Sequence, residues 1–169
     1  LGGRRGRLRI GVGASAAGEL VASAVASMMA DRRQLRLHVL AGLYDMMLND
    51  LLVGRLDALV SIRQSDRQDP FVNEQEIGTI NYVIIASARH PLAGKANLNL
   101  ADLVGERWIA GANLGAVEQA IHNSFRHAGV SPPAAEVDST SAIFYLALLD
   151  AAEHLAIFPQ MLVQRDFDM

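Results

Sequence analysis

Apolar and polar positions alternate with two different periods along the first 62 residues of the chain. Short apolar runs or strict alternation predict strands, whereas apolar side chains three and four positions apart predict helices. Strand, helix, strand, helix, strand is typical of a parallel α/β sheet. In chain order we expect a strand at 8–12, a helix at 16–30 capped by Ser15, a strand at 35–39, a helix at 44–53 ended by Gly54, and a strand at 56–62.

The second half of the chain repeats this pattern after a long apolar and β-branched stretch, residues 77–88, followed by a Pro/Gly break. We interpret that stretch as a strand that crosses into a second lobe, so that the first lobe spans 1–80 and the second 81–158. Within the second lobe we expect a short helix capped by Asn99, a strand at 108–110, a helix at 115–128, a strand at 135–137, a helix capped by Ser139 or Thr140, and a strand at 155–158.

Composition and charge exclude several classes of protein. The absence of cysteine excludes a disulfide framework and a thiol nucleophile. A net charge of -3 argues against a free-standing nucleic-acid binder, so we expect weak or no DNA binding by this chain alone. Charged residues interrupt every apolar stretch before the roughly 20 residues that a membrane span needs, and we expect no membrane partner.

The motifs that could carry catalysis are incomplete. Gly11 and Gly13 follow a strand as in a dinucleotide-binding turn, but the next strand ends in residues 39–42 without the acid that would hold a ribose. His122 and His127 are five positions apart, which does not place them on one helix face as a metal pair. We therefore expect no catalytic residue, no cofactor, no metal and no enzymatic activity.

Small residues follow the predicted parallel strands, where α/β proteins bind their ligands. Two lobes would leave a cleft there, and exposed helix N–H groups favour an anion. Ordinary tight turns would use the same residue types, and the pattern alone leaves both interpretations open. The candidate ligand-binding residues are Ala14, Ser15, Ala16, Leu43, Ser61, Ala110, Gly111, Ala112 and Asn113.

Several segments resemble the effector-binding domain of LysR-type transcriptional regulators, in order along nearly the whole chain. Each motif is short, and their combination is what makes the resemblance specific. The matching segments are 7–12 with a serine at the following helix start, 42–60 with its L-x-x-G-x-L-D pattern, the HPLA of 90–93, the DL of 102–103 with the WI of 108–109, and 156–159, which is similar to the end of GIALLP.

The resemblance implies a fold of two Rossmann-like lobes joined by crossover strands, as in type 2 periplasmic binding proteins. It also implies a small-molecule effector in the interlobe cleft, a homodimer or tetramer, a cytoplasmic location, and DNA binding only through an N-terminal winged helix-turn-helix outside this chain. Residues 159–169 would begin a segment that returns to the first lobe. The alternative is a periplasmic-type solute-binding protein for a small anion or sugar, which has the same fold.

The chain departs from the family pattern in two places. Leu43 stands where the family often has a threonine or serine that helps to hold an effector carboxylate, which puts that mode of binding in doubt. Glu153 and His154 replace the usual glycine before the last strand. The resemblance also implies the mode of dimerisation, with an interface built partly on the helix 16–30 and the edge strand 35–40, and the alanines and serines of that helix would permit close packing against a partner.

Overall fold

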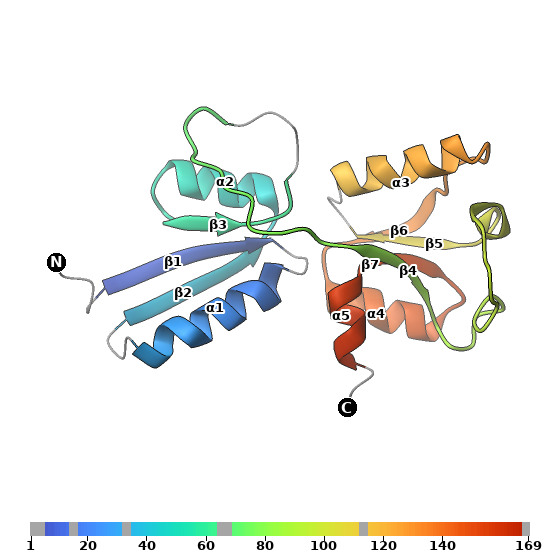
Figure 1. Cartoon of the computed structure of the whole chain (residues 1–169), viewed down its shortest axis with the longest axis horizontal. Helices are drawn as coiled ribbons and strands as arrows, with labels where there is room; N and C mark the ends of the chain where they lie inside the picture. Colours follow the sequence, from blue (N-terminus) through green and yellow to red (C-terminus); the bar gives the residue numbers. More distant parts are fainter. Residues whose placement is uncertain (1–5, 14–16, 32–34, 64–68, 112–114, 167–169) are drawn as a thin grey trace. The chain divides into compact units, whose positions relative to one another are not determined.

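The computed structural model describes residues 6–13, 17–31, 35–63, 69–111 and 115–166. The chain divides into two compact units, Leu1–Thr79 and Ile80–Met169, and each unit has a sheet of its own. Figure 1 shows the elements of each unit, coloured along the sequence. The predicted α/β class with two lobes is confirmed, because within the described residues each sheet lies inside one half.

The first unit is a three-stranded parallel sheet in the order β2-β1-β3. Gly13 of β1 is in register with Gly42 of β2, and Val12 is in register with Val60 of β3. The carboxyl ends of all three strands therefore lie along one edge. The elements are β1 (Gly6–Gly13), α1 (Ala17–Asp31), β2 (Leu35–Gly42), α2 (Tyr44–Leu52) and β3 (Ala58–Val60).

Helices α1 and α2 contribute to the packing of the first sheet in different ways. Ile10 and Val12 of β1 form a buried cluster with Val21 of α1. The alternate position, Gly11, faces Met47 of α2 and Leu56: a Cβ built on Gly11 would lie 3.1 Å from the Met47 sulfur and 2.7 Å from Leu56 Cδ1. Because side chains alternate along a strand, these contacts lie on opposite faces of the sheet.

The second unit is a four-stranded sheet in the order β4-β7-β5-β6. Strand β4 is antiparallel to β7, and the β7–β5 and β5–β6 pairs are parallel. The elements are β4 (Tyr82–Ala86), the 3-10 helix η1 (Leu100–Leu103), β5 (Trp108–Gly111), α3 (Ala116–His127), β6 (Ala135–Ser139), α4 (Ala142–Ala151), β7 (Leu155–Pro159) and α5 (Gln160–Asp166).

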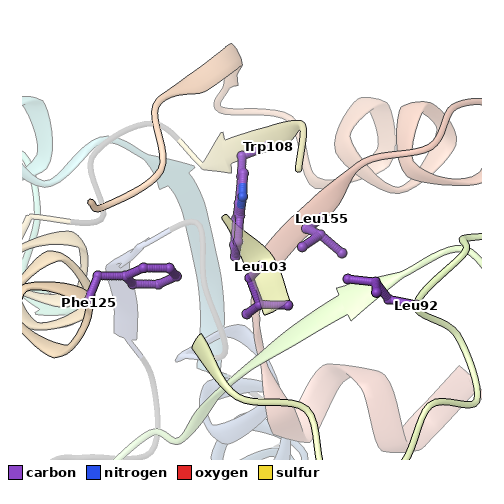
Figure 2. Packing of buried hydrophobic residues seen from close by; sticks show 5 residues of the cluster. All are labelled: Leu92, Leu103, Trp108, Phe125 and Leu155. Atoms are coloured by element: carbon purple, nitrogen blue, oxygen red, sulfur yellow. The ribbon is translucent and has the colours of Figure 1, made fainter. Parts of the chain in front are cut away.

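Strand β5 supplies side chains to two buried clusters on opposite faces of the second sheet. Trp108 packs edge-to-face on Phe125 of α3, with ring centroids 6.1 Å apart, among three leucines (Figure 2). Ile109, the next residue, belongs to the other cluster, which includes Tyr145 of α4 and Phe158 of β7. The first half of β5 is therefore fixed from both sides.

Tyr145 satisfies backbone groups at the point where β5 and β7 stop pairing. Its hydroxyl lies 3.1 Å from the carbonyl oxygen of Ile109 and 2.9 Å from that of Ile157. The registered β5–β7 pairs extend only through Trp108 and Ile109, so buried carbonyls beyond them need another donor. Burial raises the pKa of Tyr145 to about 12, and the hydroxyl stays protonated at neutral pH.

Local capping confirms one sequence prediction and corrects another. Asn99 caps η1 in a capping box with Asp102, as expected. The helix predicted to start after Ser139 or Thr140 instead begins after Ser141, whose hydroxyl accepts the Phe144 N–H. The prediction was wrong because β6 continues to Ser139, two residues beyond its expected end.

The strand predicted at 77–88 is confined to β4, and residues 77–81 are not strand. After β7, the chain continues directly into α5, where Leu162 and Val163 pack against the buried cluster around Ile109. Among the described residues, no helix combines the length and apolar character needed to cross a bilayer.

Candidate functional site

The carboxyl edge of the first sheet brings together two of the predicted ligand-binding residues. Leu43 follows β2 directly and is the extended residue that precedes α2. Ser61 follows β3, and a Cβ built on Gly13 would lie only 2.7 Å from its hydroxyl oxygen. The Ser61 side chain therefore lies against the last residue of β1, where only a glycine leaves it room.

The carboxyl edge of the second sheet carries the other predicted residues that the structure describes. Ala110 and Gly111 are half-buried at the end of β5, and Gly111 is in register with Ser139 of β6. Sequence analysis treated Ser139 only as a helix cap. Its hydroxyl accepts the Ser141 N–H, 3.1 Å away, and a strand prediction extended to Ser139 would have placed it at this edge. Ala14, Ser15, Ala16, Ala112 and Asn113 lie outside the described residues.

Helix N-termini near these edges differ in how strongly they attract an anion. The N-terminus of α2 has no side-chain cap, which leaves its N–H groups available, but Asp45 lies in its first turn. Helix α3 has Glu118 in its first turn. Helix α4 has no acid there, although Ser141 already occupies one of its N–H groups. Of these three helices, α4 is the one whose positive N-terminal dipole is not opposed by an acidic side chain in its first turn.

An ion pair fixes the start of β3 to β1 and so determines where Ser61 lies. Asp57 accepts hydrogen bonds from the Arg9 backbone N–H (2.8 Å), from its Nε (3.1 Å) and from its Nη2 (2.7 Å). The Asp57 backbone N–H donates in return to the Arg9 carbonyl. These contacts with Arg9 lower the pKa of Asp57 to about 2.

Replacing Asp57 by asparagine is expected to lower the melting temperature at neutral pH. Because the folded-state pKa of Asp57 is depressed, its ionised form contributes stability above its ordinary pKa of 3.8, and this contribution is lost as the pH falls through 2. The difference between wild type and variant should therefore disappear between pH 4 and pH 2 in melts recorded across that range. Asp138→Asn, at an exposed carboxylate of β6, is the matched control, and a pH-independent difference for Asp57→Asn would contradict the assignment.

Within the described parts of the chain, no three His, Cys, Asp or Glu side chains are grouped so that they could hold a metal ion. The histidines therefore do not form a metal site there. His90 is buried, and its Nδ1 accepts the Leu92 N–H at 3.1 Å. His154 is also buried, with Nε2 3.5 Å from a Glu136 carboxylate oxygen. His122 lies 4.0 Å from Glu118 on α3. His90 Nε2 in turn lies 3.5 Å from a Glu106 carboxylate oxygen, so both buried histidines lie beside carboxylates within the second unit.

Comparisons with known proteins agree on one family. The model of the LysR substrate binding domain matches residues 1–169. The HTH-type transcriptional regulator GbpR of Azospirillum brasilense is 26% identical over 166 residues, which cover 97% of this chain and 48% of GbpR. The chain thus spans about half the length of that curated relative.

Solved structures with low sequence identity share the fold. The effector-binding domain of QuiR in complex with shikimate has a TM-score of 0.75 at 15% identity, covering 92% of this chain and 74% of that one. Full-length CbnR complexed with its target DNA has a TM-score of 0.75 at 17% identity, covering 96% of this chain and 54% of that one. Since the family model matches the whole chain, the protein belongs to the LysR substrate-binding domain family, the effector-binding domains of LysR-type transcriptional regulators.

Proposed function

We propose that this chain binds a small anionic effector beyond the carboxyl ends of its parallel strands and acts as the sensing part of a longer, cytoplasmic DNA-binding regulator. The observation that carries the proposal is the set of small residues at those ends, with Ser61 against Gly13 in one sheet and Gly111 beside Ser139 in the other. Small side chains leave room for a ligand beyond the strand ends, where α/β sheets bind theirs. Sequence-specific DNA recognition would belong to an N-terminal winged helix-turn-helix outside this chain.

The chemistry of a relative supports an anionic effector. Shikimate, the molecule bound to QuiR, is a carboxylate. Leu43 cannot donate a hydrogen bond from its side chain, so in this chain the serine hydroxyls and helix N–H groups would have to hold the anion. The site needs no catalytic group, and we propose that the chain is not an enzyme. A transport receptor of the same fold is disfavoured, since the family model that matches the chain belongs to transcription regulators.

Thermal-shift screening of small carboxylates and sugars tests this function. A ligand that binds only the folded state at about 100 times its dissociation constant stabilises by about 2.7 kcal/mol, which is a clear rise in melting temperature. We expect carboxylates to give the rise and neutral sugars to give none. A screen in which only neutral compounds stabilise the chain would overturn the anionic assignment, and one with no stabilising compound would count against small-molecule sensing.

Replacing Ser15 by alanine is expected to weaken effector binding. A hydroxyl at the predicted start of the first helix can donate to the ligand, and its loss would cost on the order of 1 kcal/mol for a neutral ligand and about twice that for a charged one. Isothermal titration and thermal melts should be run on the same variant. A lower melting temperature with unchanged affinity would mean that Ser15 only caps its helix.

We also propose that the chain forms a dimer through α1 and the edge strand β2. Helix α1 exposes Ala22, Ser23, Ala26 and Ser27, small residues that allow close packing, and β2 exposes Val39 and Leu40 at the edge of its sheet. Ala26→Glu should weaken the dimer at least about tenfold, because it would bury an unpaired charge. Ala120→Glu, on the exposed surface of α3, is the control. Light scattering that finds a monomer at high concentration would refute the proposal, as would an Ala26→Glu variant with unchanged dimerisation.

A further inference from the structure

A block of basic side chains lies at the amino-terminal ends of β1 and β2. Arg7 is in register with Arg36, and Arg9 is in register with His38. Residues in register on neighbouring strands share a face of the sheet, as do residues two apart on one strand. These four residues, which we call the basic block, therefore lie on one face of the first sheet, in two rows of two.

This face is the one opposite α1. Leu8, Ile10 and Leu37 alternate with the block and belong to the buried cluster formed with α1. Further along the block's own face, Gly11 meets Met47 of α2 and Leu56, so α2 lies beyond the block, toward the carboxyl ends of the strands. Arg7, Arg36 and His38 are all exposed.

Acidic residues balance only part of this charge. Asp57 is hydrogen-bonded to Arg9, and the same carboxylate also interacts electrostatically with Arg7. Within the described residues, neither Arg7 nor Arg36 takes part in a salt bridge. Among the described side chains, the salt bridge that the block makes is the one between Arg9 and Asp57, in a chain whose overall net charge is -3.

Arg7 and Arg36 place like charges directly opposite each other on neighbouring strands. Like charges directly opposite each other on neighbouring strands destabilise a sheet, and exposed arginines add no buried apolar surface that would offset this cost. An anionic partner outside the unit would relieve this repulsion. Neighbouring strands are about 4.8 Å apart and rows two residues apart along a strand are separated by about 6.6 Å, so the block can meet several anionic groups at once.

We propose that the basic block contacts the phosphate backbone of duplex DNA when the whole regulator is bound to DNA, which rests on the proposed function above. Guanidinium groups match phosphate oxygens bidentately, and DNA offers closely spaced phosphates along its length. Contacts of this number are weak by themselves, in agreement with the weak DNA binding expected of this chain alone. Tethering by a separate DNA-binding domain raises the effective concentration enough for them to matter.

Salt-dependent binding of the full-length regulator to a fluorescent mixed-sequence duplex tests the proposal, because phosphate contacts carry no sequence information. Each lost phosphate contact should reduce the slope of log affinity against log salt by about 0.9. The double variant Arg7→Gln/Arg36→Gln should therefore lose about 1.8 from the slope and at least about tenfold in affinity at physiological salt. Arg126→Gln, which removes one exposed charge from α3, should leave both quantities unchanged.

Nuclear magnetic resonance on the isolated chain provides a second readout that needs no other domain. At low salt, the same duplex should shift the backbone amide signals at the amino-terminal ends of β1 and β2 and leave those of α3 in place. A double variant that folds and keeps the wild-type slope and affinity would overturn the inference. The same result is expected if the block docks an acidic protein instead of DNA. Failure of the wild-type full-length protein to bind any duplex would refute the proposed function itself.

Discussion

Replacing Trp108 by alanine is expected to lower the free energy of unfolding by about 3–5 kcal/mol, the usual loss for a fully buried large aromatic side chain. Trp108 is 2% exposed and packs on Phe125 and on leucines from three different segments, so its removal leaves a cavity that these neighbours cannot fill together. Chemical denaturation monitored by circular dichroism measures the loss. A change below about 1 kcal/mol would mean that the cluster repacks around the missing ring.

Trp108→Phe separates the contribution of the ring from that of the indole N–H. The Trp108 Nε1 atom is buried without a hydrogen-bond partner among the described residues, so phenylalanine removes an unsatisfied donor along with some packing. We expect this variant to be clearly more stable than Trp108→Ala. Equal losses in the two variants would show that the second ring of the indole provides most of the stabilisation.

Gly13→Ala is expected to destabilise the first unit by about 1–3 kcal/mol and to weaken effector binding, because the new methyl group overpacks the carboxyl edge of the sheet. Its Cβ would lie 2.7 Å from the Ser61 hydroxyl oxygen and 3.3 Å from the Ser61 Cβ, so the Ser61 side chain must move. Denaturation gives the stability, and titration with a carboxylate found in the thermal-shift screen gives the affinity.

The double variant Gly13→Ala/Ser61→Ala tests whether the cause is this one contact. Removing the hydroxyl takes away the closest atom, so much of the lost stability should return as a favourable coupling energy between the two positions. Gly78→Ala is the matched control, since a Cβ there would meet nothing within 4 Å. Additive effects of the two substitutions would show that Gly13 is required for another reason.

Sequence periodicity predicted the elements whose environment is uniform along their length. Helix α1 is shifted by one residue from its predicted range, whereas β1 and β2 contain their predicted ranges and are each three residues longer. Strand β6 was predicted too short, since its sequence AEVDS has only one partly buried apolar side chain, Val137, to mark it. A serine that caps a helix and a serine that ends a strand cannot be distinguished in the sequence unless the last residue of the strand is known.

Long-range polar contacts could not be predicted from local pattern. Arg9 and Asp57 are 48 positions apart, and Tyr145 reaches a carbonyl 36 positions away, so no spacing rule connects them. The candidate site could be predicted only as a set of strand ends. Leu43, Ser61, Ala110 and Gly111 do lie at such ends, but the register that places Ser61 against Gly13 depends on the whole sheet.

The two halves of β5 differ in a way that matters for how new effector specificities could evolve or be engineered. Trp108 and Ile109 are almost completely buried and hold the strand between two clusters, whereas Ala110 and Gly111, at the end proposed to face the ligand, are half-buried. Substitutions at the latter two positions change the chemistry of the edge while leaving both clusters intact. A library restricted to such strand-end positions would therefore keep most members folded, and selection could act on what they bind.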